Sequence, residues 1–204
     1  MPRIAHYRAD EHIDAEAHPD AFCRPAFSFG NRMRRALWNL AWFFLARFSP
    51  RPMHAWRAWL LRRFGARIAE HSRIYPGARI WAPWNLVCAD HVAIANGAEV
   101  YNPAPMHLGS HVILSQDAYL CGATHDYDDS AFPLIAYSMT VGDWAWICAR
   151  ASVAPGVQVG EGAVLGLGAI AVRDLAPWTL YGGNPAEALR PRAVNGCATP
   201  TDTP

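Results

Sequence analysis

The stretch "VGDWAWICARASVAPGVQVGEGAVL", residues 141–165, carries a branched aliphatic side chain at every sixth position. These positions are Val141, Ile147, Val153, Val159 and Leu165, and small residues recur between them. A period of six matches neither the alternation of a β-strand nor the helical repeat of about 3.6 residues. It is expected of a chain that turns a corner every six residues, closes a triangular turn and points its aliphatic side chains into a prism.

The same period extends upstream over two further blocks. Their aliphatic residues are Ile68, Ile74, Ile80, Leu86 and Val92, followed by Leu108, Leu114 and Leu120. We place a slip of register at residues 96–106, because the spacing from Val92 to Leu108 is not a multiple of six. The sequence therefore predicts a mainly β fold, a left-handed parallel β-helix of hexapeptide repeats over residues 67–182, with one extruded loop at residues 123–140.

Two amphipathic helices are predicted within residues 31–66. Residues 31–48 place apolar side chains at helical spacing, a Pro-rich turn follows, and residues 53–65 form the second helix. The apolar positions of the first helix are Leu37, Leu40, Ala41, Phe44, Leu45 and Phe48. Residues 1–30 are expected to form an irregular arm, and residues 183–204 a C-terminal cap and flexible tail.

The role of this helical segment is open between two interpretations. Nine arginines and no acidic residue lie between Asn31 and Ala69. Either the apolar faces pack on the β-helix, or residues 31–64 lie on an anionic membrane with arginines outward and tryptophans at the interface. The longest apolar stretch, residues 36–46, is too short for the roughly 20 residues that a membrane-spanning helix needs.

The overall composition narrows the class of protein. A net charge of +1 gives no overall electrostatic attraction to nucleic acid, so we expect no nucleic-acid partner. The N-terminus lacks the apolar segment of a secretory signal. The cysteines form no CxxC pair, which favours free thiols in a reducing cytoplasm; they are Cys23, Cys88, Cys121, Cys148 and Cys197. We expect a cytoplasmic protein, peripheral at the inner membrane if its helices bind lipid.

Three further pieces of sequence resemble a known family. The loop "GATHDYDDSAFPLI" (residues 122–135), the repeats that follow it and the ending "YGGNPA" (residues 181–186) are similar to the hexapeptide-repeat acyltransferases. The helical segment before the repeats resembles the colanic acid biosynthesis acetyltransferases, relatives of the maltose and galactoside acetyltransferases. The resemblance implies a homotrimer that transfers an acetyl group from acetyl-CoA, without a metal, to the hydroxyl of a sugar or lipid-linked oligosaccharide in exopolysaccharide biosynthesis.

The acceptor side of such a reaction needs a base, because a sugar hydroxyl is a poor nucleophile. Histidine suits this role, and His125 stands in the loop that interrupts the repeats and matches the catalytic histidine of the family. Asp126 either orients the imidazole or binds sugar, or it forms an ordinary turn. Asn102 either contributes near the catalytic histidine or forms a turn before a proline. Trp146 aligns with an aromatic residue near the family's site, or it packs between subunits.

The donor side follows from the resemblance alone. In the family the pantetheine arm of the coenzyme bonds to backbone amides at the corners of the coils, and the matching residues are Ala149 and Leu167. Gly168 allows the arm to approach closely. Arg173 replaces a lysine that contacts the phosphates of CoA, and Asn184 is either adjacent to CoA or structural.

Two alternatives remain at this level. One is a metalloenzyme similar to the γ-class carbonic anhydrases, which share the repeat and bind zinc through three histidines. Its candidate ligands are His91, His107, His111 and His125, but the spacing expected after His125 leads to Ser130 and leaves the triad incomplete. The other is a non-catalytic β-helix scaffold associated with a membrane, which would bind no acetyl-CoA.

Overall fold

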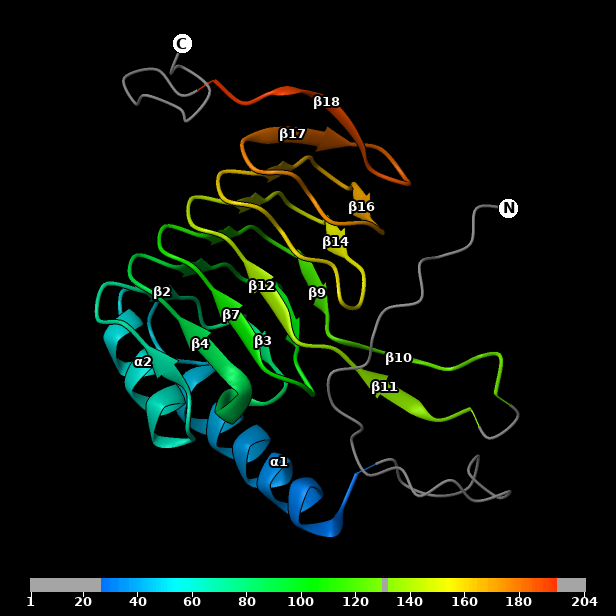
Figure 1. Ribbon diagram of the computed structural model, residues 1–204. Coiled ribbons are helices and arrows are strands. Elements are labelled where there is room, and N and C mark those ends of the chain that lie inside the picture. The colour runs from blue at the N-terminus through cyan, green and yellow to red at the C-terminus, as the bar shows by residue number, and fades with distance from the viewer. Residues whose placement is uncertain (1–26, 130–131, 194–204) are drawn as a thin grey trace.

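The computed structural model describes residues 27–129 and 132–193. These residues wind into a three-sided prism of short parallel strands (Figure 1). The predicted parallel β-helix with N-terminal helices and one extruded loop is confirmed. Most of the arm predicted at residues 1–30, and the tail from residue 194, lie outside the described residues.

Each side of the prism is one sheet. Face 1 contains β1 (Arg67–Ile68), β4 (Leu86–Cys88), β7 (Met106–Leu108) and β12 (Met139–Val141). Face 2 contains β2 (Arg73–Ile74), β5 (Ala93–Ile94), β8 (Ile113–Leu114), β13 (Trp146–Ile147), β15 (Val164–Leu165), β17 (Thr179–Gly182) and the antiparallel β18 (Glu187–Pro191). Face 3 contains β3 (Arg79–Ile80), β6 (Glu99–Tyr101), β9 (Tyr119–Cys121), β14 (Ser152–Val153) and β16 (Ile170–Ala171).

Aliphatic side chains stack in columns inside the prism, and every residue predicted to point inward is buried. On face 2 the column runs in register through Ile74, Ile94, Leu114, Ile147 and Leu165. Fully burying such a side chain contributes about 1.5–3 kcal/mol. The stacked column therefore stabilises strands that are individually only two residues long.

The predicted register is wrong at Leu86 and Val92. Strand pairing aligns Ile68 with Cys88, so the inward column continues through Cys88 and not through Leu86. The same shift moves the next inward position from Val92 to Ile94. Leu86 and Val92 are nevertheless buried, two residues before the inward positions. Hydrophobicity alone therefore could not distinguish the two registers.

Within the described chain, every departure from the six-residue period falls on one edge of the prism. This is the edge between faces 3 and 1, here called edge 3–1. Across it, inward positions are spaced as Ile80 to Cys88, Val100 to Leu108, Leu120 to Val141, Val153 to Val159 and Ala171 to Leu175. The longer segments contain the 3-10 helix η3 (Pro83–Asn85) and a hairpin of β10 (Ala123–His125) and β11 (Leu134–Ala136). The edge between faces 1 and 2 and the edge between faces 2 and 3, here called edges 1–2 and 2–3, keep the six-residue spacing.

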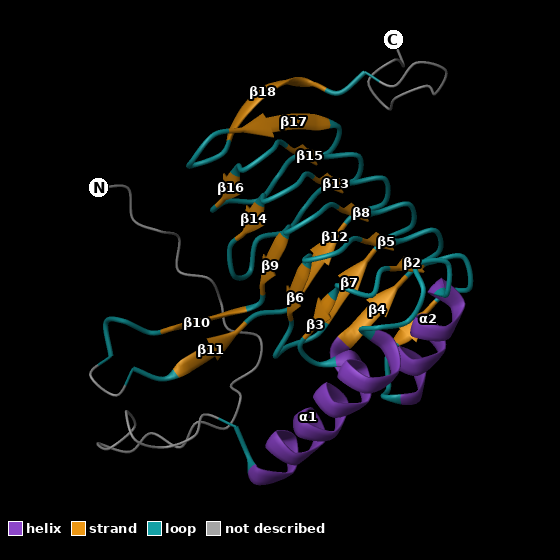
Figure 2. Ribbon diagram, turned by 180° about the vertical axis from the view of Figure 1, so that it is seen from behind, coloured by secondary structure: helices purple, strands orange, loops and turns teal. Residues whose placement is uncertain are grey.

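The predicted helices cover the N-terminal end of the prism (Figures 1 and 2). Helix α1 (Phe29–Ala41) continues as the π-helical segment η2 (Trp42–Ala46), and α2 (His54–Arg63) follows after a turn. No helix in the described part of the chain combines the length and apolar character needed to cross a bilayer.

Helix α1 contacts the prism through a different side from its predicted apolar stripe. Trp38 is buried, and its indole N–H donates to the carbonyl of Ile80 at 2.7 Å. The guanidinium groups of Arg34 and Arg35 lie 4.0 and 4.1 Å from ring centroids of Trp84 and Trp81. The stripe faces solvent, at 56–72% exposure for Leu37, Leu40, Phe44 and Phe48. Cation–π contacts and a buried indole therefore decide which side packs.

Candidate active site

His125 ends strand β10, which leaves the prism at edge 3–1 and pairs with β11. Its Nδ1 lies 2.8 Å from the carbonyl oxygen of Phe132, and the two rings stack with centroids 4.6 Å apart. A carbonyl oxygen can only accept, so Nδ1 carries the hydrogen in the neutral ring and Nε2 keeps its lone pair. The hairpin thus presents an imidazole with a defined basic nitrogen.

Asn102 lies beneath this hairpin and is fully buried. Its side-chain oxygen accepts from the Ala82 N–H at 2.9 Å, and its amide nitrogen donates to the Ala82 carbonyl at 2.8 Å. Asn85 in turn donates to the Asn102 carbonyl at 3.1 Å. Asn102 therefore joins two successive turns at edge 3–1, which supports the structural alternative, and its side chain has no exposed surface for a substrate.

A small second core fixes the root of the hairpin. Ala104, Ala123 and Ala136 are buried together, and Tyr101 and Leu134 pack against them. The Gly122 N–H donates to the Tyr101 carbonyl at 2.7 Å. The position of His125 therefore depends on packing that lies outside the main hydrophobic column.

Asp126 shapes the turn after the histidine. Its carboxylate accepts from the Asp128 N–H at 3.1 Å, and its own N–H donates to the Pro133 carbonyl at 2.9 Å. The first is the bond of an Asx turn, and the second is a backbone bond across the hairpin. Burial, and then the charge of Asp126, raise the pKa of the neighbouring Tyr137 hydroxyl. The geometry gives Asp126 the turn-forming role that the sequence left open.

Three of the predicted donor residues, Ala149, Leu167 and Gly168, share edge 2–3. Gly168 donates its N–H to the Ala149 carbonyl at 3.0 Å, whereas the N–H groups of Ala149 and Leu167 donate to no acceptor among the described residues. Leu167 is 77% exposed. Gly168 has a φ of +66°, and nothing lies within 4 Å of the position a Cβ would occupy. The edge thus offers open backbone donors beside unobstructed space.

Trp146 lies on face 2 and is 42% exposed. Its indole N–H donates to the Ser115 hydroxyl at 2.8 Å, which ties the ring to the preceding turn of the β-helix. Arg173 is exposed at edge 3–1, and Asn184 is exposed in the turn between β17 and β18. One chain therefore does not bring Arg173 and His125 onto the edge that carries the donor residues.

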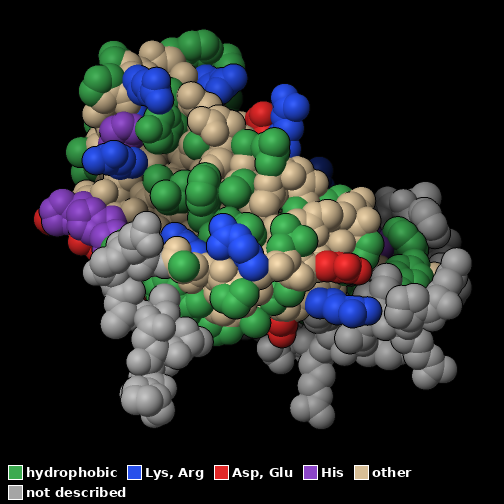
Figure 3. All heavy atoms as spheres, turned by 90° about the horizontal axis from the view of Figure 1, so that it is seen from above, with side chains coloured by type: hydrophobic (Ala, Val, Ile, Leu, Met, Phe, Trp, Pro, Cys, Tyr) green, Lys and Arg blue, Asp and Glu red, His purple; other side chains and the backbone are tan. Residues whose placement is uncertain are grey.

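The candidate zinc ligands are dispersed. His91 and His111 stand on edge 1–2, His107 is exposed on face 1, and His125 is on the hairpin. Figure 3 shows histidine side chains gathered along one edge, where the rings of His71, His91 and His111 stack with centroids 5.0 and 4.7 Å apart. The described residues of one chain do not assemble the histidine set of the metalloenzyme alternative.

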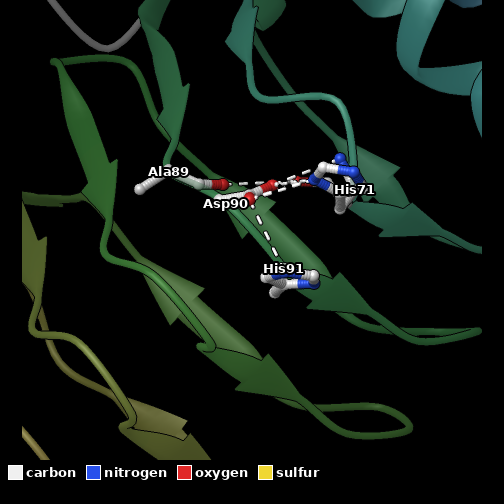
Figure 4. Close-up of polar contacts among 5 residues, drawn as sticks. His71, Ala89, Asp90 and His91 are labelled. Carbon is white, nitrogen blue, oxygen red and sulfur yellow. Dashed lines mark hydrogen bonds and ion pairs between the residues drawn. The ribbon is translucent and has the colours of Figure 1, made fainter.

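Asp90 contacts two of these histidines (Figure 4). Its oxygens lie 3.0 Å from His71 Nδ1 and 3.5 Å from His91 Nε2. Desolvation opposes the effect, but hydrogen bonds from His71 and from the His91 backbone lower the pKa of Asp90. Asp90 also accepts the His71 N–H, as Asp143 accepts the Ser110 N–H on the same edge. This repeated corner bond accounts for the position of the Asp90 carboxylate.

Sequence reasoning missed the groups that orient the candidate side chains. The carbonyl of Phe132 fixes the His125 tautomer, and no side-chain pattern signals a backbone acceptor, because every residue supplies one. Ser115 orients Trp146 from thirty-one positions away in the chain. The six-residue period could have signalled this second contact, since it places residues of successive turns side by side.

Comparisons with known proteins agree with this fold. No protein-family model matches the chain. It is 32% identical over 166 residues to the Escherichia coli protein named "Putative colanic acid biosynthesis acetyltransferase WcaF", covering 81% of this chain and 91% of that one. A Vibrio cholerae hexapeptide-repeat acetyltransferase, solved with acetyl-CoA, superposes with a TM-score of 0.73 at 22% identity, covering 83% and 93%. A Clostridium difficile maltose O-acetyltransferase also gives 0.73, at 18% identity, covering 82% and 90%.

Proposed function

Because the chain belongs to the hexapeptide-repeat acetyltransferases, we propose that it transfers the acetyl group of acetyl-CoA to a hydroxyl group of a sugar. The observation that carries the proposal is the bond between His125 Nδ1 and the Phe132 carbonyl, which leaves Nε2 as the base. The names of the colanic acid and maltose relatives support a sugar as acceptor, and the former supports a place in exopolysaccharide assembly.

In the proposed reaction, His125 Nε2 removes the proton of the acceptor hydroxyl as its oxygen attacks the thioester carbonyl carbon. The tetrahedral intermediate then breaks the carbon–sulfur bond, and the sulfur of CoA takes the proton from the imidazolium. The sugar leaves as an acetyl ester and CoA as a thiol. General-base catalysis of this kind contributes typically about 100- to 10,000-fold in rate.

The open N–H groups of Ala149 and Leu167 would bind the pantetheine arm, with Gly168 allowing close approach. Arg173 would bind the phosphates of CoA, because its guanidinium can pair with them bidentately. Trp146, whose indole is held by Ser115, would offer a flat surface to the substrates.

This arrangement requires more than one copy of the chain. The base and Arg173 are on edge 3–1, whereas the pantetheine donors are on edge 2–3. A second copy placed alongside would bring its edge 3–1 against edge 2–3 of the first. Such a contact joins two different surfaces, and it closes into a ring when the rotation permits. We propose that this ring is the homotrimer that the family resemblance implies, with one site at each contact.

The test is acetyl transfer by the purified protein, with nucleotide sugars and lipid-linked sugars as acceptors. Chromatography measures CoA released from acetyl-CoA, and mass spectrometry identifies the acetylated acceptor. Sedimentation measures the oligomeric state in the same preparation. We expect transfer that depends on a sugar acceptor. Binding of stoichiometric zinc together with carbon dioxide hydration, and no transfer, would replace this proposal with the metalloenzyme alternative.

A further inference from the structure

Helix α1 and segment η2 expose a continuous apolar surface on the side that points away from the prism. The side chains that form it, here called the outer face, are Phe29, Met33, Leu37, Leu40, Phe44 and Phe48, each 46–75% exposed. Their spacing places them on one side of the helix. Contiguous exposed apolar surface of this kind marks a site of interaction with a protein or a membrane.

The helix cannot simply turn so that the outer face packs on the prism. The inner side of the helix is engaged, because Trp38 is buried, donates to the Ile80 carbonyl and packs against the ring of Phe64 at 5.1 Å. Arg34 and Arg35, which the sequence suggested would point outward, lie over tryptophans of the prism. Rotating the helix to bury the outer face would break these contacts and expose Trp38.

The charge around this face is positive and uncompensated. No acidic residue occurs between residues 27 and 69. Arg32, Arg47, Arg51 and Arg63 are exposed, and no carboxylate of the described residues lies within 4.0 Å of any of them. Two of them also contact other parts of the protein, since Arg47 lines the groove beside Gly77 and Arg51 lies 5.1 Å from the ring centroid of Tyr75. An exposed apolar helix side on a segment whose only formal charges are positive complements an anionic bilayer, where acyl chains and negative headgroups occur together.

We propose that the outer face of α1–η2 lies on an anionic lipid surface, with its apolar side chains in the interface and the exposed arginines among the headgroups. A second copy of the chain is a less suitable occupant. Copies that share a site along edges 3–1 and 2–3 meet side by side, and the helices lie at the end of the prism (Figures 1 and 2). Such an assembly leaves the outer faces uncovered.

The same end of the prism adjoins the proposed donor edge. A groove of about 620 Å³ runs between η2 and edge 2–3, lined in part by Trp42, Arg47, Asn96 and Gln116. Ala149 and Leu167 continue this edge toward the C-terminal end. If the proposed transfer to a sugar is correct, a membrane-anchored acceptor would reach the acetyl donor along this edge. The lipid contact itself stands on the helix and does not depend on the catalytic proposal.

Vesicle flotation with the full-length protein tests the contact. We expect the protein to float with phosphatidylglycerol–phosphatidylcholine vesicles at low salt, and to bind pure phosphatidylcholine at least ten-fold more weakly. Leu40→Ser with Phe44→Ser should reduce binding at least ten-fold. The matched control is Leu189→Ser, because Leu189 is 64% exposed on β18 at the opposite end. Arg32→Gln with Arg51→Gln should weaken binding, whereas Arg190→Gln on β18 should not.

Circular dichroism and acetyl transfer to a water-soluble acceptor distinguish loss of the contact from loss of fold or of catalysis, because both should be unchanged in these variants. The proposal is overturned by absence of binding to anionic vesicles at low salt, or by equal binding of the Leu40/Phe44 variant. It is also overturned if that variant changes the mass measured by sedimentation, because the outer face would then be a contact between copies of the chain. Binding that appears only after deletion of residues 1–26 would overturn it as well.

Discussion

His125 and Phe132 face one another across the hairpin, with the imidazole Nδ1 2.8 Å from the carbonyl oxygen and the two rings stacked. The bond selects the tautomer, and the stacking fixes the plane of the imidazole. The extruded hairpin therefore fixes the orientation of Nε2, the nitrogen that we propose as the base. A solvated loop histidine would have neither constraint.

Replacing His125 separates orientation from basicity. His125→Asn places an amide N–H near the Phe132 carbonyl but removes the base, so we expect kcat to fall about 100- to 10,000-fold with CoA binding unchanged. His125→Ala should lose as much activity. Steady-state kinetics and calorimetric CoA binding check this, with His107→Ala as the control because His107 is exposed on face 1. Full activity in His125→Asn would remove this residue from the mechanism.

Asn102→Ala should destabilise the fold. It leaves the buried N–H of Ala82 without a partner, and an unsatisfied group of this kind costs about 1–3 kcal/mol. The Ala82 carbonyl loses one of its two donors and still accepts from the Asn85 N–H at 3.1 Å. We expect the free energy of unfolding in urea to fall by about 1–3 kcal/mol. Asn39→Ala, on the exposed side of α1, serves as the control. A normal unfolding midpoint in Asn102→Ala would contradict the structural role.

Gly142→Ala and Gly30→Ala make a matched pair at two glycines. A Cβ at Gly142 would lie 2.5 Å from the backbone nitrogen of Glu161, so the stacked turns must separate. A Cβ at Gly30 in α1 meets nothing within 4 Å. Thermal unfolding should show a strong loss of stability for Gly142→Ala. Gly30→Ala should be neutral or stabilising by up to about 1 kcal/mol, because alanine favours the helix.

Cys148 reports on the donor edge because it precedes Ala149. Burial raises the pKa of the Cys148 thiol, so little thiolate forms at neutral pH and alkylation should be slow. We expect CoA to slow alkylation of Cys148 further, measured by peptide mass spectrometry at pH 8.5, while Cys121 on face 3 reacts as before. Cys88, whose pKa burial raises to about 12, should react only on unfolding. Equal labelling of Cys148 with and without CoA would argue against the proposed pantetheine path.

Asp90 should make stability depend on pH in the acid range. Its pKa is lower in the folded chain than in the unfolded chain, so the carboxylate stabilises the fold above the unfolded-state pKa. That contribution is lost as the pH falls through the folded-state pKa. Asp90→Asn should therefore lower the unfolding temperature at pH 7 and have less effect at pH 3. The same shift at both pH values would exclude an effect of ionisation.

The sequence predicted the prism because burial follows the six-residue period directly. Val141, Ile147 and Val153 are inward residues on the three successive faces that the pattern requires. The pattern failed at Leu86 and Val92, because the residues two positions later, Cys88 and Ile94, are also apolar and buried. The correct register depends on strand pairing between turns of the β-helix, and the amino-acid sequence alone does not specify that pairing.

The side of α1 that packs was unpredictable for a different reason. Hydrophobicity ranks Leu40 and Phe44 as the buried positions, whereas the prism offers tryptophans that pair with Arg34 and Arg35. The identity of the proposed base was available from the sequence, because His125 follows the last inward residue before the interruption. Its orientation was not, since a backbone carbonyl provides it.

The confinement of all irregular spacing to edge 3–1 divides the molecule into two parts that can change independently during evolution. Insertions there lengthen or reshape the hairpin without altering the strand pairing of the three faces or the corners of edge 2–3. In the proposed reaction, such insertions would vary the hairpin beside the acceptor while the pantetheine donors Ala149 and Leu167 keep their positions on edge 2–3. Exchanging hairpins between relatives would therefore show whether edge 3–1 sets the range of acceptors.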